Sequence, residues 1–407
     1  MRVLFSTIGS RGDVQPLVAL ASYLKTLGHE VTVCAPPDFR EWIERLGIAM
    51  TPIGPEVRRF AASRPAATQA QNPLTAERRR HMAEATVATQ FETLTSAAQG
   101  CDVIVAATAL QVAARSVAEK MGIPYVFTAY APVVLPSPHH APPPLPPLPG
   151  QTQPTTTDNR ELWTQDAARF NDLFAAAVNA RRASLGLAEI GDVRSHMMTD
   201  QPWLAADPTL GPWPDPTDCH VFQTGAWILP DERPLSTDLE TFLDNRDPPI
   251  FFGFGSTRAP EGAGQAMLGA ARTLGRRAIV SKGWFDDSPL ENERDCMSIG
   301  EANLHALFPR VAAVVHHGGA GTTTAAALAG APQVVIPNHY DQHYWAQRVH
   351  TLGIGTAHAA GAPTRDSLAN ALAQSLRPQV AAHARAVART VRRDGTKVAT
   401  ERLVALA

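Results

Sequence analysis

Residues 316–324, His-His-Gly-Gly-Ala-Gly-Thr-Thr-Thr, have the composition of a phosphate-binding turn. The run follows an apolar segment at 311–315 and precedes an alanine-rich stretch and a second apolar segment. This order predicts a buried strand, a glycine-rich turn, a helix that starts near Thr322, and another parallel strand. Glycine lets the backbone approach a ligand closely, and the free N–H groups of a helix N-terminus attract anions. The segment therefore suits a diphosphate.

The two histidines of this turn have different expected roles. His316 ends the apolar segment, so burial at the strand end accounts for it, whereas His317 adjoins the first glycine and is the better ligand. The run Phe-Gly-Phe-Gly-Ser at 252–256 places Ser256 at another strand end, where its hydroxyl could meet a phosphate. Packing alone could explain these glycines, because they lack the G-x-G-x-x-G spacing of a dinucleotide site.

A carboxylate follows the first predicted strand, 2–7. The run Gly-Ser-Arg-Gly-Asp-Val-Gln-Pro at 9–16 leaves this strand and enters a helix predicted over 16–27, with Asp13 just before the helix. Asp13 could cap the helix, which stabilises by about 1 kcal/mol. It could also take a proton from a hydroxyl, because ligands bind where parallel strands end. Taken alone, the residues favour the cap.

A third polar group lies in the run at 337–349. Asp341 and Gln342 stand at a predicted helix start, where a carboxylate and an amide could bind sugar hydroxyls or Asp341 could cap the helix. His339 and His343 are four residues apart, but a third ligand is missing, so no metal site is expected. The sequence also lacks an Asp-x-Asp triad, which argues against a nucleotide held through a divalent ion.

Composition narrows the class of protein. At 407 residues the chain is too long for one core, and two domains of about 200 residues are expected. A net charge of −2 gives no reason to expect nucleic acid or a membrane surface as a partner. The four scattered cysteines indicate neither zinc nor disulfides, and neither a signal peptide nor a membrane span is apparent. We therefore expect a cytoplasmic protein without stable membrane insertion.

Apolar strands alternate with helices in both halves, which predicts an α/β protein with two doubly wound, Rossmann-like domains. The expected strands are 2–7, 30–36, 102–107, 124–130, 250–254, 277–281, 311–315 and 333–337. The predicted divisions are an N-terminal domain at 1–205, a linker at 206–222, a C-terminal domain at 223–385 and a terminal helix at 386–407.

Residues 131–154 hold ten of the 34 prolines, which predicts an extended loop. This loop is either a disordered surface segment or a flap over a binding cleft. Long loops at the carboxyl ends of strands often carry ligands. Tyr130, His139 and His140 are the residues that could face a second substrate.

Together these motifs resemble the GT-B glycosyltransferases that invert the sugar of a nucleotide-sugar donor, with parallel sheets facing a central cleft. The resemblance covers essentially the whole chain and is strongest to enzymes that glycosylate glycopeptide antibiotics. Runs at 199–208 and 223–236, including Gln-Thr-Gly-Ala-Trp, support that group. The run at 9–16 is shared with sterol glucosyltransferases. The proline-rich loop departs from the glycopeptide group.

The resemblance implies that the N-terminal domain binds the acceptor, that the C-terminal domain binds the nucleotide-sugar donor, and that the terminal helix crosses back to the first domain. It also implies a role for each candidate residue. Asp13 would be the general base and Ser10 would lie near the donor phosphates. Trp284 and Ile299 would line the nucleobase and ribose pocket, and Asp341 and Gln342 would hold the sugar. The implied diphosphate ligands are Ser256, His317, Gly318, Gly319, Gly321 and Thr322.

The implied reaction transfers a hexose, with glucose expected first, from a UDP- or TDP-sugar to a hydroxyl of a hydrophobic or aromatic aglycone such as a glycopeptide or polyketide. No metal or other cofactor is expected, and the protein would be a monomer or weak dimer. Because base and phosphate site lie in different domains, domain closure would be needed. Alternatives are a sterol or lipid glucosyltransferase, a nucleotide-sugar 2-epimerase, and an inactive partner protein, the last disfavoured because Asp13 and His317 are both present.

Overall fold

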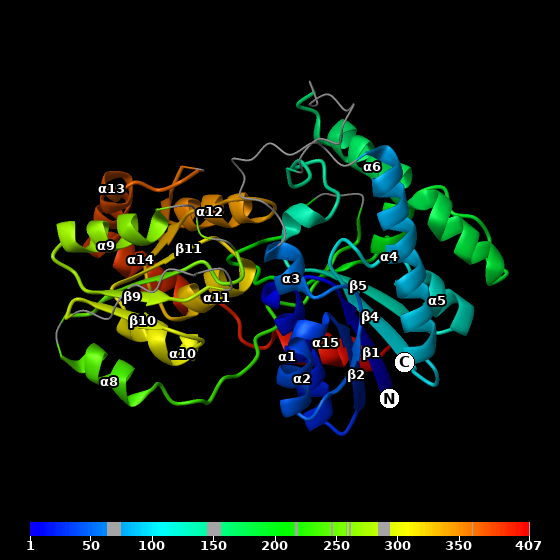
Figure 1. Ribbon diagram of the computed structural model, residues 1–407, viewed down its shortest axis with the longest axis horizontal. Coiled ribbons are helices and arrows are strands. Elements are labelled where there is room, and N and C mark those ends of the chain that lie inside the picture. Colours follow the sequence, from blue (N-terminus) through cyan, green and yellow to red (C-terminus); the bar gives the residue numbers. More distant parts are fainter. Residues whose placement is uncertain are drawn as a thin grey trace. The chain divides into compact units, whose positions relative to one another are not determined.

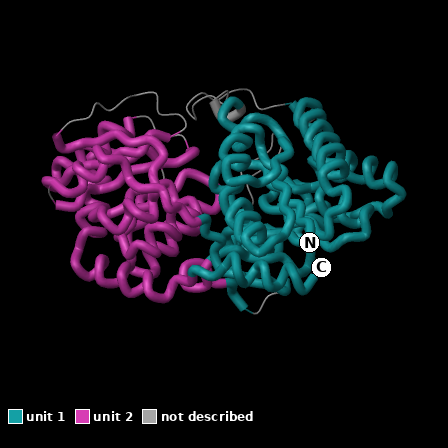
Figure 2. The backbone as a smooth tube through the Cα atoms, turned by 90° about the horizontal axis from the view of Figure 1, so that it is seen from below, with its two compact units in different colours: residues 1–206, 213–229, 393–407 teal, residues 207–212, 230–392 magenta. Residues whose placement is uncertain are grey.

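The computed structural model describes residues 1–62, 75–144, 156–215, 219–245, 247–257, 259, 262–283, 294–359 and 361–406. The chain forms two compact units, shown in different colours in Figure 2. Unit 1 comprises Met1–Ala206, Trp213–Leu229 and Arg393–Ala407, and unit 2 comprises Asp207–Pro212 and Pro230–Arg392. The sequence predicted one linker over 206–222, whereas packing assigns part of that range to each unit.

Unit 1 is built on a parallel sheet of seven strands in the order β3-β2-β1-β4-β5-β6-β7. Its central strands are almost wholly buried because helices cover both faces. The strands are β1 (Arg2–Thr7), β2 (Glu30–Ala35), β3 (Ala49–Pro52), β4 (Val103–Ala107), β5 (Tyr125–Ala129), β6 (Trp203–Leu204) and β7 (Phe222–Gln223).

The helices of unit 1 include the last one of the chain. They are α1 (Arg11–Thr26), α2 (Arg40–Arg45), α3 (Val57–Ala62), α4 (Ala76–Ala97), α5 (Ala114–Met121), α6 (Asn159–Ser184), α7 (Val193–Met198) and α15 (Gly395–Val404), with short 3₁₀ turns η1 (Pro37–Phe39) and η2 (Pro132–Val134). Helix α15 packs on α1, as Figure 1 shows, so the end of the chain completes the unit in which the chain begins.

Unit 2 repeats the architecture with six parallel strands in the order β10-β9-β8-β11-β12-β13. The strands are β8 (Ile250–Gly253), β9 (Ala278–Ser281), β10 (Cys296–Ile299), β11 (Ala313–His316), β12 (Gln333–Val335) and β13 (Gly355–Ala357). The helices are α8 (Thr237–Asp244), α9 (Ala263–Thr273), α10 (Leu304–Leu307), η3 (Phe308–Arg310), α11 (Ala320–Leu328), α12 (Gln342–Thr351), α13 (Arg365–Ser375) and α14 (Pro378–Ala388).

Alternate residues of the second sheet serve two separate cores. Phe252 and Val280 belong to a cluster with α9 and α13, while Phe251 and Ile279 belong to one with α8 and α10. A sheet buried on both faces in this way is doubly wound, as the alternation of strands and helices predicted. Each sheet reverses its winding at one point, between β1 and β4 in unit 1 and between β8 and β11 in unit 2. Ligands of such sheets bind at the carboxyl ends of the strands at this switch point.

Two helices begin earlier than the sequence predicted. Helix α1 starts at Arg11 rather than at Pro16, and α11 starts at Ala320 rather than near Thr322. Proline was taken as a first-turn residue, but Pro16 lies inside α1, where it can donate no backbone hydrogen bond. As a consequence Asp13 lies in the first turn of the helix, not before it.

The described part of the proline-rich segment, residues 131–144, packs against α6. Leu135 and Ser137 are buried, and Asn159 donates a side-chain hydrogen bond of 2.8 Å to the carbonyl of Pro138. The indole N–H of Trp163 donates to the carbonyl of His140 at 2.9 Å. These residues are therefore anchored, while residues 145–155 lie outside the described part of the chain.

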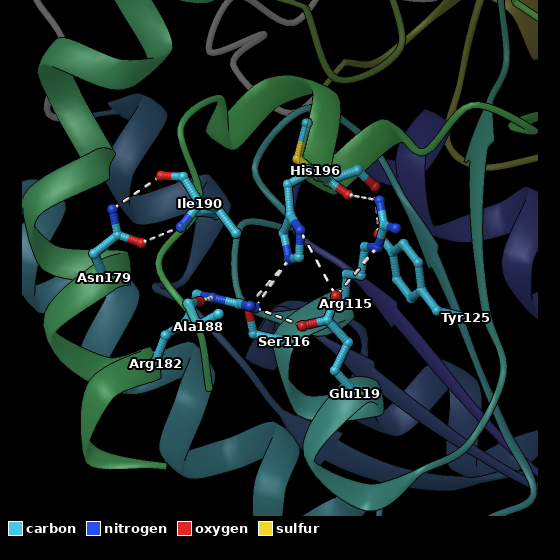
Figure 3. Close-up of polar contacts among 10 residues, drawn as sticks. Arg115, Ser116, Glu119, Tyr125, Asn179, Arg182, Ala188, Ile190 and His196 are labelled. Atoms are coloured by element: carbon cyan, nitrogen blue, oxygen red, sulfur yellow. Dashed lines mark hydrogen bonds and ion pairs between the residues drawn. The ribbon is translucent and has the colours of Figure 1, made fainter. Parts of the chain in front are cut away.

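A buried polar cluster joins α5, α6 and α7 (Figure 3). The Arg182 guanidinium donates to Glu119 at 2.6 Å and to the Ser116 hydroxyl at 2.8 Å. It also approaches Nε2 of His196 at 3.3 Å, and since arginine can only donate, this nitrogen accepts and the imidazole is neutral. Arg115 donates to the His196 carbonyl at 2.8 Å. The cluster therefore links three helices of unit 1 through polar contacts, beside the buried apolar residues that they also carry.

Candidate functional site

The carboxylate of Asp13 is held by the residue that precedes its helix. Ser10 is the N-cap of α1, and its backbone N–H and its hydroxyl donate to Oδ2 of Asp13 at 2.6 and 3.1 Å. Oδ1 has no hydrogen bond with the described residues. Burial raises the pKa of Asp13, and the bonds from Ser10 oppose that rise.

Gly9 makes room for this carboxylate. A Cβ at position 9 would lie 2.2 Å from Oδ2 of Asp13, and the backbone there has a φ of +155°. The capping and proton-acceptor interpretations of Asp13 are thus compatible. One oxygen closes the first turn of α1 and the other remains without a partner among the described residues, at the carboxyl end of β1.

Tyr130, which follows β5, bonds the same turn of α1. Its hydroxyl donates to the backbone carbonyl of Asp13 at 3.1 Å, and its ring packs edge-on against Trp227 at 6.3 Å. Burial raises the pKa of Tyr130 well above its ordinary value, so the hydroxyl stays protonated. The phenol was expected to face an acceptor, but its oxygen is engaged with α1.

The two histidines of the proline-rich segment differ in environment. His140 packs edge-on against Trp163 and Trp213, with ring centroids 6.0 and 6.1 Å away, and burial lowers its pKa. His139 is exposed, and its backbone N–H donates to the Ser137 hydroxyl at 3.1 Å. His140 is therefore part of an aromatic cluster of unit 1, whereas His139 faces solvent.

In unit 2 the two glycine-rich turns meet at His317. A Cβ on Gly255 would lie 3.4 Å from Cε1 of His317, and one on Gly319 would lie 2.6 Å from Nε2. Nδ1 of His317 is buried without a hydrogen-bond partner among the described residues. Burial lowers the pKa of His317 to about 3, so the imidazole is neutral. It can therefore offer an anion an N–H donor rather than a full charge.

His316 has the structural role that its position predicted. Its side chain is fully buried, Nδ1 accepts the N–H of Gly318 at 3.1 Å, and Nε2 lies 2.8 Å from Oε1 of Gln333. Because Nδ1 accepts, the proton is on Nε2, which donates to the glutamine. This tautomer ties the turn to β12.

Helix α11 presents its N-terminus beside His317. Gly319 is its N-cap, and Gly321 and Thr322 lie in its first turn, where Gly321 is exposed and a Cβ would meet nothing within 4 Å. The first turn of a helix leaves backbone N–H groups without intrahelical partners. Gly318 is needed for another reason, since its φ is +92° and a Cβ would lie 2.7 Å from Val335.

Some polar atoms of the Asp341 and Gln342 side chains form hydrogen bonds within the protein. Oε1 of Gln342 accepts the backbone N–H groups of Asn338 and His339 at 2.8 and 3.2 Å. Oδ2 of Asp341 accepts the indole N–H of Trp345 at 3.1 Å. Among the described residues the amide nitrogen of Gln342 has no partner, so this nitrogen is the group left to consider for a sugar.

The remaining candidates are spread over β8 to β10. Ser256 is partly buried in the turn after β8, and Ile299 is buried at the end of β10. Trp284 lies outside the described residues. A small pocket opens at the carboxyl ends of β8 and β9. It is lined in part by Phe252, Gly253, Phe254, Thr257, Ser281 and Gly283.

Comparison with known proteins identifies the family. Residues 3–137 match the N-terminal domain of glycosyltransferase family 28, and residues 295–401 match the C-terminal domain of proteins like erythromycin biosynthesis protein CIII. Glycosyltransferase GtfE of Amycolatopsis orientalis is 47% identical over 100% of this chain and 97% of its own. The chain belongs to these glycosyltransferases.

Further relatives and solved structures are similar to the glycosyltransferase over nearly its whole length. The vancomycin aglycone glucosyltransferase of Amycolatopsis orientalis is 46% identical over 99% of this chain and 97% of its own. The glycosyltransferase of kitacinnamycin has a TM-score of 0.72 at 18% identity, covering 99% of this chain and 98% of its own. VinC, solved with DTDP, has a TM-score of 0.69 at 21% identity and covers 98% of both chains. The structural matches confirm the two-domain GT-B fold.

The glycosyltransferase also contains site features that the sequence did not reveal. Thr108, in the loop after β4, has a φ of +78°, and its hydroxyl donates to the carbonyl of Ile8 at 3.2 Å. Tyr340, just before Asp341, has a φ of +56°. Such backbone is costly for residues other than glycine and concentrates at functional sites. No residue type or spacing marks these positions, so only the structure could find them.

The described part of the glycosyltransferase contains neither a cluster of metal-binding side chains nor a helix that could span a membrane. No group of three or more histidine, cysteine, aspartate or glutamate side chains there could hold a metal ion. No helix among the same residues has the length and apolar character to cross a membrane.

Proposed function

We propose that this glycosyltransferase inverts the sugar as it moves a hexose, glucose first, from a UDP- or TDP-sugar to a hydroxyl of a glycopeptide or a similar natural-product aglycone. The observation that carries the proposal is the Asp13 carboxylate, held at the switch point of unit 1 with one oxygen bonded to Ser10 and the other unpartnered among the described residues. This arrangement provides a fixed proton acceptor.

In the proposed reaction Asp13 accepts the proton of the acceptor hydroxyl. The hydroxyl oxygen forms a bond to the anomeric carbon while the bond from that carbon to the diphosphate oxygen breaks on the opposite face. A positioned base of this kind contributes about 10²–10⁴-fold. The raised pKa of Asp13 brings it nearer to working pH, which strengthens it as a base.

The leaving diphosphate is proposed to bind unit 2. His317 would donate a hydrogen bond, and the N–H groups at the start of α11, around Gly321 and Thr322, would meet the developing negative charge. The Ser256 hydroxyl of the same unit would add a donor, whereas Ser10 lies in unit 1 and its hydroxyl donates to Asp13. The base and the phosphate ligands belong to different units, so the reaction requires both units to reach the same substrates.

The identity of the sugar is proposed from the relatives. Similarity to the vancomycin aglycone glucosyltransferase favours glucose as the sugar of this chain's donor. However, a dTDP-epi-vancosaminyltransferase of the same organism is 44% identical over 95% of this chain. Identity values this similar do not separate the two donors. The aminosugar donor that this relative's name gives, dTDP-epi-vancosamine, is therefore the second candidate. The acceptor and the cytoplasmic location are likewise proposals.

The proposal is tested by a panel of purified nucleotide sugars and acceptors analysed by mass spectrometry. UDP- and TDP-glucose and a TDP-aminosugar are crossed with glycopeptide, polyketide and sterol aglycones. We expect a mass gain of one hexose on the glycopeptide, and the coupling constant of the anomeric proton in the NMR spectrum of the product should show inverted configuration. Transfer only to sterol, or conversion of UDP-N-acetylglucosamine without acceptor, would replace this function by one of the alternatives.

Asp13→Asn tests the base itself. Asparagine keeps the size of the side chain and can still accept a hydrogen bond from Ser10 but cannot take up the proton. We expect turnover to fall by about 10²–10⁴-fold, with the Kd for TDP within about twofold of wild type. His81→Ala, an exposed change on α4 of the same unit, is the control and should leave turnover within about twofold. Near-normal turnover of Asp13→Asn would rule out this base.

A further inference from the structure

We propose that Tyr130 is a positioning residue for proton transfer, because its hydroxyl fixes the first turn of α1 and with it the carboxylate of Asp13. The inference rests on the proposed role of Asp13 as base. It assigns to Tyr130 a task other than contact with the acceptor, which was the expectation from the sequence. The argument depends on hydrogen bonds, on a proline and on one aromatic contact.

Two hydroxyls converge on the same carbonyl oxygen. The Asp13 carbonyl accepts the Tyr130 hydroxyl at 3.1 Å and the Thr7 hydroxyl at 3.4 Å. Thr7 is the last residue of β1, and Tyr130 follows the last residue of β5. Strand β4 lies between these two strands, so the first turn of α1 is tied to both sides of the switch point.

The turn needs this support because Pro16 lies inside α1. In an α-helix the N–H of residue 16 would bond the carbonyl of residue 12, and proline has no N–H. Gly12 therefore loses its intrahelical donor, and glycine adds backbone freedom of its own. The first turn of α1 is held less firmly by its own backbone than an ordinary helix start. The two hydroxyls from the sheet bond the neighbouring carbonyl, that of Asp13, and so hold the same turn.

Packing against a buried tryptophan restricts the orientation of the Tyr130 side chain. Its ring packs edge-on against Trp227 at an interplanar angle of 71°. Trp227 is 4% exposed, and its indole N–H donates to the Thr224 hydroxyl at 3.0 Å. Tyrosine therefore cannot swing away from α1 without disturbing a buried tryptophan.

Displacement of this turn would reach the reacting group directly. The Ser10 N–H and hydroxyl bind Oδ2 of Asp13 within the same turn, and Gly9 leaves just enough space for that oxygen. A shift of about 1 Å in a catalytic group can cost about 10²-fold in rate. Loosening the bonds from Ser10 would also remove an effect that lowers the pKa of Asp13.

Tyr130→Phe tests the proposal because it keeps the ring and removes the hydroxyl. We expect kcat to fall about tenfold or more, while KM for the acceptor and the Kd for TDP change by less than about twofold. The acidic limb of the kcat profile should move to higher pH, since weaker bonds from Ser10 leave the carboxyl group harder to ionise. A residue with a structural role alone would not move that limb.

Tyr125→Phe is the matched control. Tyr125 is the first residue of β5, and Tyr130 follows the last. The Tyr125 hydroxyl donates to the carbonyl of Met197 in α7 at 2.9 Å, away from α1. It should lower the melting temperature without moving kcat or the acidic limb. If Tyr130→Phe behaves like this control, or raises only the KM for the acceptor, the positioning role is wrong.

A second variant, Thr7→Val, covers the case in which Tyr130→Phe does not fold. Valine keeps the branched shape of this fully buried side chain and removes the longer of the two hydrogen bonds. We expect a smaller fall in kcat and a shift of the acidic limb in the same direction; an unchanged kcat and limb would count against the proposal. Loss of turnover in Asp13→Asn with normal Tyr130→Phe and Thr7→Val would refute the positioning role alone. Normal turnover in Asp13→Asn would refute the base.

Discussion

At the residue scale, burial shifts the pKa of one side chain in each proposed half of the site, and both shifts favour the neutral form. Burial raises the pKa of Asp13 and lowers that of His317, so both groups are less charged than they would be in water. A base with a raised pKa accepts protons readily. A neutral histidine beside a helix N-terminus binds an anion through hydrogen bonds without first holding a counter-charge of its own.

His317→Ala should weaken binding of the nucleoside diphosphate. Loss of a hydrogen bond to a charged group costs about 1.5–3 kcal/mol, which corresponds to a rise of about 10- to 150-fold in the Kd for TDP. Transfer should fall with it. Isothermal titration calorimetry with TDP measures this, and the exposed His350→Ala, in the last turn of α12, is the control. An unchanged Kd for TDP in His317→Ala would contradict the phosphate role.

From the sequence, positions could be predicted only for residues whose type restricts where they occur in a fold. The glycines, His316, His317 and Asp13 stand at strand ends, and burial of His316 was predicted from the preceding apolar run. Tyr130 and Gln342 could not be assigned in this way. The Tyr130 bond joins residues 117 positions apart, and Gln342 bonds backbone groups whose position depends on the fold.

At the element scale, buried strands could be predicted and short or amphipathic elements could not. Strand β1 has the predicted bounds, because a continuous apolar run determines it. Strands β6 and β7 have two residues each, too few for a pattern. Helix α6 carries a buried stripe at Trp163, Phe170, Phe174 and Val178, a helical spacing that its many charged residues obscured.

The cluster that joins α5, α6 and α7 should make unit 1 sensitive to acid. Burial lowers the pKa of His196 from 6.5 to about 4, against the opposing effect of Glu119. The unfolded chain therefore binds a proton that the folded chain does not, so stability is full above about pH 6.5 and falls toward pH 4. Protonation would place a positive imidazolium against Arg182 and Arg115.

His196→Gln tests this sign. Urea unfolding at pH 7.5 and 4.5 should show that the variant loses about 2–3 kcal/mol less stability over this range than wild type. Part of the loss must remain, since burial also lowers the pKa of His316 and His317. His81→Gln, an exposed change on α4, is the control and should follow wild type. Equal losses in all three proteins would exclude His196 as an acid-sensitive group.

At the scale of the whole molecule, the alternation of strands and helices was enough to predict two doubly wound domains. The order of strands in each sheet, and hence the two switch points, came only from the structure. Both proposed groups of site residues then fall at those points, Asp13 after β1 and His317 after β11. Sequence motifs and sheet topology are independent observations, and their agreement supports the proposed division of labour between units.

This division predicts that unit 1 can be weakened without loss of TDP binding. Leu403 of α15 is fully buried in unit 1, and Leu403→Ala should lower the free energy of unfolding of that unit by about 2–5 kcal/mol. Leu406→Ala, at a position 39% exposed, should change it by less than about 0.5 kcal/mol. Because TDP is proposed to bind unit 2 alone, calorimetry below the unfolding temperature should give the same Kd for TDP in both variants. A weaker Kd in Leu403→Ala alone would show that unit 1 contributes to donor binding, and the assignment of all donor contacts to unit 2 would then be wrong.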